Sequence, residues 1–203
     1  MSNVKEKDEK VYFVQRLASY IIDVLIVMFV ATLLSMPFQN NDSVTKLTKQ
    51  SSEYANSYIE GKIGISEYMN KTASIDYQLA KASGVSNIIT IFLNVLYFVV
   101  IQKSLGGQTI GKKLLKIKVA KKDKSDLTMN DMVLRGLINN SIWGDIIIAI
   151  LLLINKNSYF YGSMIIELIC FMIIIVSIFM VIIRKDGRSV SDLIAKTQVV
   201  RED

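Results

Sequence analysis

Residues 159–183 read YFYGSMIIELICFMIIIVSIFMVII and contain one charged side chain, Glu167, among 25 residues. An α-helix of roughly 20 apolar residues is long enough to cross the hydrocarbon core of a bilayer. A helix of a soluble bundle needs a polar stripe that faces water, and residues 165–180 have no polar side chain beyond Glu167 and Ser177. The stretch therefore predicts a transmembrane helix and argues against a soluble bundle.

Three further stretches are almost free of charge. Residues 17–36 contain only Asp23, residues 85–102 contain no charged side chain, and residues 136–154 contain only Asp145. A cleaved signal peptide is the alternative for the first stretch, but this stretch is longer than the usual apolar region of such signals. We therefore predict an all-α membrane protein, in which residues 1–203 form a single domain with four transmembrane helices in the lipid bilayer.

The positive charges are distributed unevenly between these spans. The segment 103–135 has nine Lys and Arg residues against three acids, and the tail 184–203 has five Lys and Arg residues. The segment 37–84 instead balances five lysines with five acids. Because Lys and Arg accumulate in cytoplasmic loops, we predict a multi-pass protein of the cell membrane with both termini in the cytoplasm. This orientation puts residues 37–84 outside the cell.

The extracytoplasmic segment is too long for a simple connection. Residues 44–60 and 66–81 are rich in helix-forming residues, and Gly61 and Gly64 separate them. We expect two short helices here. Their function is open between a recognition surface for a protein partner and a solvated spacer.

The cytoplasmic segment contains GGQTIGKK at residues 106–113, which resembles a phosphate-binding loop. Such a loop has Ser or Thr after its lysine, whereas this chain has Lys113, so a nucleotide site is not expected. Residues 115–119 alternate as a β-strand does, and residues 198–200 are a candidate partner strand. Thr128 and Asp131 have the spacing of a helix capping box, which predicts a helix that runs into the third span.

Composition excludes several classes of function. The chain has no histidine and one cysteine, Cys170, which argues against a disulfide framework, histidine catalysis and histidine-containing metal sites. We predict that the protein is not an enzyme and has no cofactor or bound metal. The net charge of +6 is explained by membrane orientation and anionic headgroups, because no basic stripe interleaved with aromatic residues indicates nucleic-acid binding.

Three segments carry charged residues in a recognisable order. They are RLASYIID at residues 16–23, GQTIGKKLLKIKV at residues 107–119 followed by Arg135, and SDLIAKTQVV at residues 191–200. Together they resemble the RDD family of small bacterial membrane proteins, which is named for one arginine and two aspartates. The resemblance implies an integral membrane protein, and transport, because some members are associated with sodium–proton exchange. Lys196 departs from the family pattern, since relatives tend to have glycine there.

Three charged residues form a candidate structural clamp. Arg16 and Asp23 are two helical turns apart on nearly the same helix face, and Asp192 is predicted on the same side of the membrane. A charged aspartate within a span costs roughly 2.5–3.5 kcal/mol on insertion scales, so Asp23 needs a partner or a proton. Arg16 would join these acids and fix the first helix against the cytoplasmic segment.

Polar residues within the spans form a candidate ion or proton path: Asp23, Asn94, Asp145 and Glu167. Carboxylates at different depths suit proton or cation movement because each can be neutral in lipid and charged when hydrated. One hypothesis is therefore a proton-coupled transporter of Na⁺ or K⁺ that works as a homo-oligomer. The alternative is a non-transporting recognition, immunity or assembly factor that acts through residues 37–84.

Overall fold

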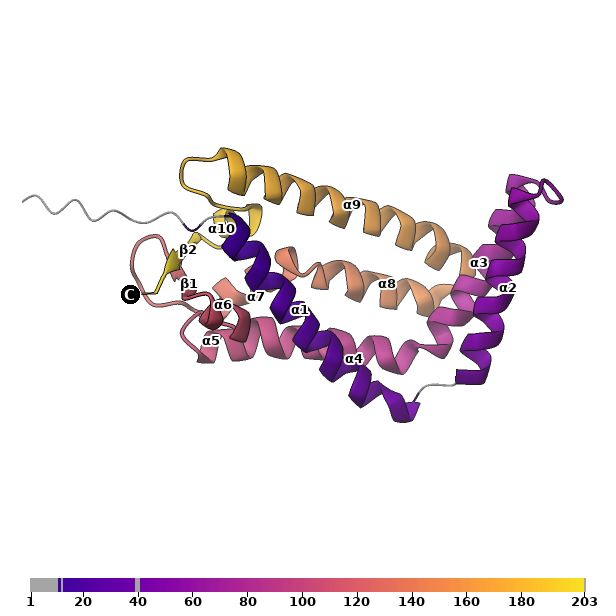
Figure 1. The fold of residues 1–203 in the computed structure, drawn as a ribbon, viewed down its shortest axis with the longest axis horizontal. Helices are drawn as coiled ribbons and strands as arrows, with labels where there is room; N and C mark the ends of the chain where they lie inside the picture. Colours follow the sequence, from indigo (N-terminus) through magenta and orange to yellow (C-terminus); the bar gives the residue numbers. More distant parts are fainter. Residues whose placement is uncertain (1–10, 12, 39–40, 203) are drawn as a thin grey trace, which may run out of the picture. The chain divides into compact units, whose positions relative to one another are not determined.

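The computed structural model describes residue 11, residues 13–38 and residues 41–202. The described residues form two compact units. The first contains the residues up to Phe29, Phe92–Ile142 and the residues from Phe171 onward, and the second contains Val30–Ile91 and Trp143–Cys170. Figure 1 shows helices along most of the chain and two short strands, β1 and β2, which confirms the predominantly helical class.

Within the described residues, three helices are long and apolar enough to cross a bilayer. They are α1 (Phe13–Ser35), which continues into η1 (Met36–Phe38); the run of α4 (Gly84–Val95), η2 (Leu96–Ile101) and α5 (Gln102–Ser104); and α9 (Lys156–Ile183). Large apolar side chains on them are exposed, as at Phe29, Phe92 and Ile183, which expose 66%, 63% and 75% of their surface. Apolar surface of this extent is typical of helices that face lipid.

The third predicted span is broken rather than continuous. α7 (Met129–Asn139) and α8 (Ile142–Ile154) meet at an angle of 66°, so they count as a fourth span only when taken together. Ser141 adopts a positive φ of 52°, a conformation that interrupts the helical hydrogen-bond ladder. The helix expected to run from Thr128 into the span at residues 136–154 is therefore interrupted at Ser141. The capping box of Thr128 and Asp131 at the start of α7 is confirmed.

The segment between the first two spans folds into α2 (Asn41–Ile59) and α3 (Ile65–Ala82), which confirms the two predicted helices. They pack against each other within the second unit. The rings of Tyr58 and Tyr68 stack at 4.9 Å, and the Lys71 ammonium lies 4.7 Å from the centre of the Tyr54 ring. Gly61 adopts a positive φ of 71° in the turn between the helices. The pair is therefore a helical hairpin with aromatic contacts along its seam.

β1 (Ile117–Lys121) and β2 (Thr197–Arg201) form a two-stranded antiparallel sheet. The predicted pairing of the two segments is confirmed, but β1 starts two residues later than predicted. Lys116 causes the shift, because its φ of 52° makes the turn that precedes the strand. Val119 on β1 is buried against Val99 and Met132, so the sheet packs onto η2 and α7.

Each strand belongs to a helix–strand repeat with the same local fold. The first helix–strand repeat is residues 107–121 and contains α6 (Ile110–Leu114) and β1; the second is residues 187–201 and contains α10 (Val190–Ile194) and β2. Each opens with a glycine of positive φ, caps its helix with a hydroxyl residue (Thr109 or Ser189) and turns into its strand at a lysine of positive φ. Lys196 therefore makes the left-handed turn before β2, as Lys116 does before β1.

The two helix–strand repeats are related by an approximate two-fold axis. Val119 of one repeat pairs with its equivalent, Val199, at the centre of the sheet. The hydrogen bonds at the sheet ends are also equivalent, because Glu202 N donates to Lys116 O and Lys122 N donates to Lys196 O. The repeats differ at the third residue of the short helix, which is Lys112 in α6 and Asp192 in α10. This difference produces two unlike polar clusters.

Candidate functional site

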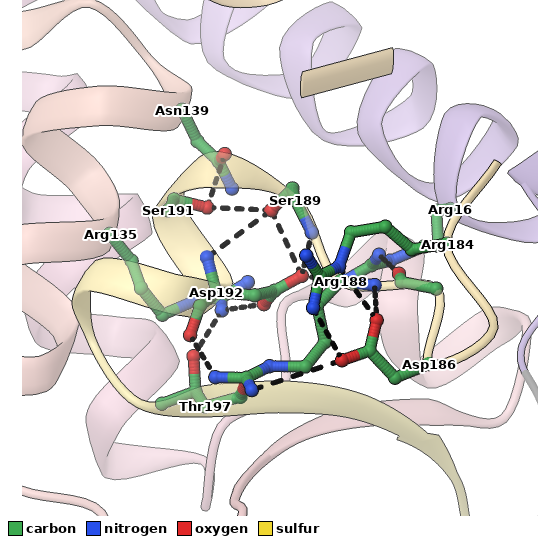
Figure 2. Close-up of polar contacts among 11 residues, drawn as sticks. Arg16, Arg135, Asn139, Arg184, Asp186, Arg188, Ser189, Ser191, Asp192 and Thr197 are labelled. Atoms are coloured by element: carbon green, nitrogen blue, oxygen red, sulfur yellow. Dashed lines mark hydrogen bonds and ion pairs between the residues drawn. The ribbon is translucent and has the colours of Figure 1, made fainter. Parts of the chain in front are cut away.

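The first polar cluster surrounds Asp192 and is shown in Figure 2. The Asp192 carboxylate is fully buried and forms ion pairs with two guanidinium groups, those of Arg16 on α1 and Arg135 on α7. The amide and hydroxyl of Ser189 also donate to it, at 3.0 Å and 2.9 Å. We call these four residues the Asp192 cluster. It joins α1, α7 and the second helix–strand repeat in one contact.

Further hydrogen bonds, to one hydroxyl and to three backbone carbonyls, fix the guanidinium groups in place. Arg135 also donates to the hydroxyl of Thr197 at 2.5 Å, and Arg16 also donates to the carbonyl of Gly187. Arg188 donates to the carbonyls of Asp192 and Thr197, each at 3.0 Å. Each arginine therefore spans at least two acceptors, which the planar, multiply donating guanidinium can do and an ammonium cannot do as well.

The arginines determine the ionisation of Asp192. Burial alone would raise the pKa of this carboxyl, but the fields of Arg135 and Arg16 and the hydrogen bonds from Ser189 and Arg135 outweigh it. The pKa of Asp192 therefore lies well below its usual range. Since arginine does not lose its proton in proteins, the Asp192 cluster keeps its charges over the whole physiological pH range.

The second polar cluster surrounds Asp23, which lies inside α1 and is also fully buried. Its carboxylate accepts hydrogen bonds from the phenol of Tyr97 at 2.7 Å, the hydroxyl of Thr109 at 2.5 Å and the amide of Gly111 at 2.8 Å. Tyr97 lies in the π-helical segment η2, and such irregular helical turns often occur at functional sites. We call these residues, together with Lys112, the Asp23 cluster.

Lys112 supplies the positive charge of the Asp23 cluster. Its ammonium lies 3.9 Å from Asp23 Oδ2 and 3.4 Å from Thr109 Oγ1. Burial lowers the pKa of Lys112 to about 8, because the attraction of Asp23 does not fully compensate for lost hydration and for repulsion by Arg135 and Arg16. The charge that faces Asp23 can therefore be lost near physiological pH, unlike the charges that face Asp192.

Gly111 allows α6 to approach α1 this closely. A Cβ atom on Gly111 would lie 2.3 Å from the Ser19 carbonyl oxygen and 2.9 Å from Asp23 Oδ1. Both distances are shorter than real Cβ contacts. The absence of a side chain at this position is therefore a condition for the hydrogen bond from the Gly111 amide to Asp23.

Comparison with protein-family models gives one match, the RDD family, over residues 11–196. The chain belongs to the RDD family. The match covers nearly the whole chain and includes Asp23, Asp192 and the two arginines that pair with Asp192. No curated protein and no solved structure matches this chain. The family and the apolar helices together show that this is a membrane protein.

The geometry of this RDD protein separates the three residues predicted as a clamp. Arg16 contacts Asp192, as that hypothesis requires. Asp23 accepts its hydrogen bonds in the Asp23 cluster instead, where the opposite charge comes from Lys112. The predicted residues are therefore divided between two clusters that both involve α1 and lie in the same compact unit.

The remaining residues of the predicted path have different surroundings. Asn94 is partly buried in α4, and Asp145 is partly buried in α8. Glu167 is exposed on α9 and lines a hollow of the second unit together with Asp76, Asn87 and Tyr159. Asp23 and Asn94 belong to the first unit, whereas Asp145 and Glu167 belong to the second.

Sequence reasoning named Arg135 only as part of the family resemblance, and it assigned no role to five other residues of the clusters: Tyr97, Thr109, Gly111, Lys112 and Ser189. Thr109 and Lys112 belong to the stretch that resembles a phosphate-binding loop. The amide of Gly111 in that stretch donates to Asp23, so it is not available to a phosphate. The recurrence of the helix–strand repeat is a sequence signal that could have drawn attention to positions 112 and 192.

Proposed function

We propose that this RDD protein is a multi-pass protein of the cell membrane that exchanges monovalent cations for protons through carboxylates in its helices. The observation that carries the proposal is Asp23, a fully buried carboxylate inside a membrane helix with three hydrogen-bond donors and an ammonium beside it. A carboxylate held in this way offers two oxygen atoms inside the protein, and oxygen is the ligand type that hard cations prefer.

The proposed orientation puts both helix–strand repeats in the cytoplasm. We count the bent pair of α7 and α8 as one span, in addition to α1, the run from α4 to α5, and α9. With four spans, both ends of the chain lie on the same side of the membrane. The lysines and arginines of residues 103–135 and 184–201 then lie on the cytoplasmic side, as the positive-inside rule favours. Cysteine labelling at positions 52 and 125 tests this topology, and labelling of position 125 from outside intact cells would overturn it.

Carboxylates of the second unit support a path for cations as well. Glu167, Asp76 and the phenol of Tyr159 line one hollow. Burial raises the pKa of Asp76, so this group holds its proton more tightly than an exposed aspartate does. Asp145 on α8 is a further partly buried acid. Because four helices enclose little space for a path, the proposal includes assembly of two or more copies, which light scattering of the purified protein measures.

Reconstituted vesicles test the proposed function. Purified full-length protein is inserted into vesicles with an imposed pH gradient, and a pH-sensitive dye reports dissipation after addition of NaCl, KCl or choline chloride. We expect dissipation with Na⁺ or K⁺ and none with choline. No dissipation with any of these cations would contradict the proposal.

Substitutions of the path residues separate transport from packing. Asp145→Asn and Glu167→Gln keep the size of the side chain and most hydrogen bonds, and they should slow cation-dependent dissipation while the protein remains folded. Asp126→Asn is the matched control, because Asp126 is exposed in the connection between β1 and α7. Unchanged dissipation in both path variants would favour a packing role for these two carboxylates.

A recognition role through α2 and α3 is the second candidate function. The hairpin has a hollow lined by Tyr54, Glu67, Asn70 and Lys71, a mixture of aromatic, charged and amide groups that suits a polar protein surface. Under this alternative the parent protein dissipates no gradient. Tyr54→Ala then abolishes binding of the protein partner without changing the abundance of the membrane protein. Under the transport proposal, Tyr54→Ala leaves dissipation in vesicles close to the parent rate.

A further inference from the structure

The first compact unit contains a hollow of about 1420 Å³ beside the two-stranded sheet. Both strands line it, for example with Lys118 of β1 and Val200 of β2. Among the described residues of its lining, seven are lysine or arginine and three are aspartate or glutamate. This lining includes no residue of the Asp192 cluster or the Asp23 cluster. The hollow, which we call the basic hollow, is therefore a feature separate from both clusters.

The basic hollow lies where three membrane helices begin or end. Its lining includes Gln15 in the first turn of α1, Lys103 in α5 at the end of the second long apolar run, and Lys185, two residues after α9. The apolar part of such helices occupies the hydrocarbon core, so their ends lie at the level of the lipid headgroups. The basic hollow therefore lies at the depth of the phospholipid phosphates.

Several positive charges of the basic hollow are not neutralised by the protein. Four of its lysines form no ion pair with any residue that the structure describes: Lys103, Lys116, Lys118 and Lys185. Two of its acids are already engaged, because Asp186 pairs with Arg184 and Glu202 accepts a hydrogen bond from Gln108. The basic hollow therefore presents an excess of positive charge to a ligand.

We propose that the basic hollow binds the headgroup of an anionic phospholipid that carries two phosphates. The phosphate oxygens accept hydrogen bonds from the lysine ammonium groups, and the glycerol part contacts apolar side chains of the lining such as Leu115 and Val200. Basic pockets between membrane helices bind headgroups of this kind. The volume exceeds that of most small-molecule sites, which leaves room for two phosphates. The inference goes beyond the proposed function and does not depend on it, because lipid binding requires no transport.

The position of the basic hollow favours a lipid over a soluble phosphate compound. An anionic headgroup is already confined to the level of Lys103 and Lys185, whereas a soluble compound loses its translational freedom when it binds. The negative surface potential of anionic lipids also attracts basic residues at the ends of membrane helices. We therefore assign the basic hollow to a lipid and treat a soluble phosphate as the competing outcome of the test.

Lipid binding by the purified full-length protein tests the inference. The protein in an uncharged detergent is mixed with cardiolipin, phosphatidylglycerol or phosphatidylcholine, and native mass spectrometry measures the protein–lipid complexes. These headgroups carry two phosphates, one phosphate, and one phosphate neutralised by choline. We expect the Kd for cardiolipin to be at least about tenfold lower than that for phosphatidylcholine, the effect of one hydrogen bond to a charged group. Equal affinities for the three lipids would overturn the inference.

Paired substitutions locate the bound lipid. Lys103→Gln combined with Lys185→Gln removes two charges of the basic hollow and should raise the Kd for cardiolipin at least about tenfold. Lys113→Gln combined with Lys122→Gln is the matched control, because both lysines are exposed outside the basic hollow and the same charge is removed. The control should bind cardiolipin as the parent does.

Two results would contradict the assignment. Equal Kd values for the two paired variants would show that the lipid responds only to the overall charge of the protein. Displacement of cardiolipin by inorganic pyrophosphate at a similar concentration would assign the basic hollow to a soluble phosphate compound, whereas we expect cardiolipin to stay bound. If Lys103→Gln with Lys185→Gln does not fold, Lys118→Gln with Lys185→Gln gives the same decision.

Discussion

The two helix–strand repeats each hold a buried carboxylate, but they do so with opposite arrangements of charge. In the second repeat, Asp192 belongs to the short helix and two arginines reach it from α1 and α7. In the first repeat, the equivalent position is Lys112, and the carboxylate is Asp23 of α1. The short helix therefore supplies the negative charge of the ion pair in the second repeat and the positive charge in the first. One carboxylate faces charges that cannot be removed, and the other faces a charge that can.

This difference has a physical consequence for the roles of the two clusters. Arginine keeps its proton at all physiological pH values, whereas a buried lysine can lose its proton. The Asp192 cluster suits a permanent structural contact between helices, whereas the counter-charge in the Asp23 cluster can be lost. Substitutions that remove one partner at a time test this comparison.

The largest expected effect is that of Asp192→Asn. The substitution leaves Arg16 and Arg135 buried without their shared anion, and loss of one member of a buried ion pair costs about 3–5 kcal/mol. Thermal unfolding in detergent and the abundance of the protein in membranes measure the loss. Asp186→Asn is the control, because Asp186 pairs with Arg184 at the surface, where such pairs contribute about 1 kcal/mol or less.

Arg16→Ala should have a smaller effect, because Arg135 remains to neutralise Asp192. We expect a loss of about 1.5–3 kcal/mol, the range for hydrogen bonds to charged groups. Arg16→Lys should restore only part of it, since an ammonium cannot reach both Asp192 and the Gly187 carbonyl with the same geometry. Unfolding midpoints equal to the parent value in Arg16→Ala would remove this residue from the structural account.

Gly111→Ala tests the close approach of α6 to Asp23. The new methyl group would overlap the Ser19 carbonyl and Asp23 Oδ1, and overpacking of this kind costs about 1–3 kcal/mol. Gly84→Ala is the matched control, because nothing lies within 4 Å of the position of its Cβ atom. We expect Gly111→Ala to reduce the unfolding midpoint. Equal midpoints in the two variants would contradict the described contact.

The smallest predicted effect is a pH dependence that distinguishes Lys112 from Asp192. Because the pKa of Lys112 is lowered in the folded protein to about 8 from an ordinary value of 10.5, the unfolded chain binds more protons between these values. Stability should therefore rise with pH in this window, by at most about 1.4 kcal/mol per pH unit. The free energy of unfolding of the parent, minus that of Lys112→Gln, gives this slope between pH 8 and pH 9.5.

Asp192 should show no such dependence in this range. Its pKa is lowered in the folded state, so its contribution to stability is fully present above its ordinary value of 3.8 and is lost only as pH falls below that value. The difference in unfolding free energy between the parent and Asp192→Asn should be constant from pH 6 to pH 9. A slope in this range would show that the Asp192 cluster also exchanges protons.

The sequence was sufficient to predict features that depend on local pattern. Gaps between charges located the three long apolar helices, alternation located β1 to within two residues, and the spacing of Thr128 and Asp131 located the start of α7. The break between α7 and α8 depends on the left-handed conformation of Ser141, which follows Asn139 and Asn140; Asn and Ser favour turns, but the predicted span did not take this signal into account.

The clusters themselves depend on contacts between distant parts of the chain. Asp23 meets Tyr97 and Thr109, which are far from it in sequence, so the spacing of charges along α1 could identify Arg16 and Asp23 but not their partners. Lys112 lies among several lysines of similar appearance. Only its burial beside Asp23 separates it from its exposed neighbour Lys113.

The most direct test of the difference between the clusters is a comparison of the unfolding midpoints of Asp23→Asn and Asp192→Asn at pH 9. In Asp23→Asn, Lys112 can lose its proton and avoid a buried unpaired charge, whereas Arg16 and Arg135 in Asp192→Asn cannot. We therefore predict a decrease for Asp23→Asn that is less than half the decrease for Asp192→Asn. Equal decreases in the two variants at pH 9 would contradict the account, because both carboxylates would then be permanent structural partners.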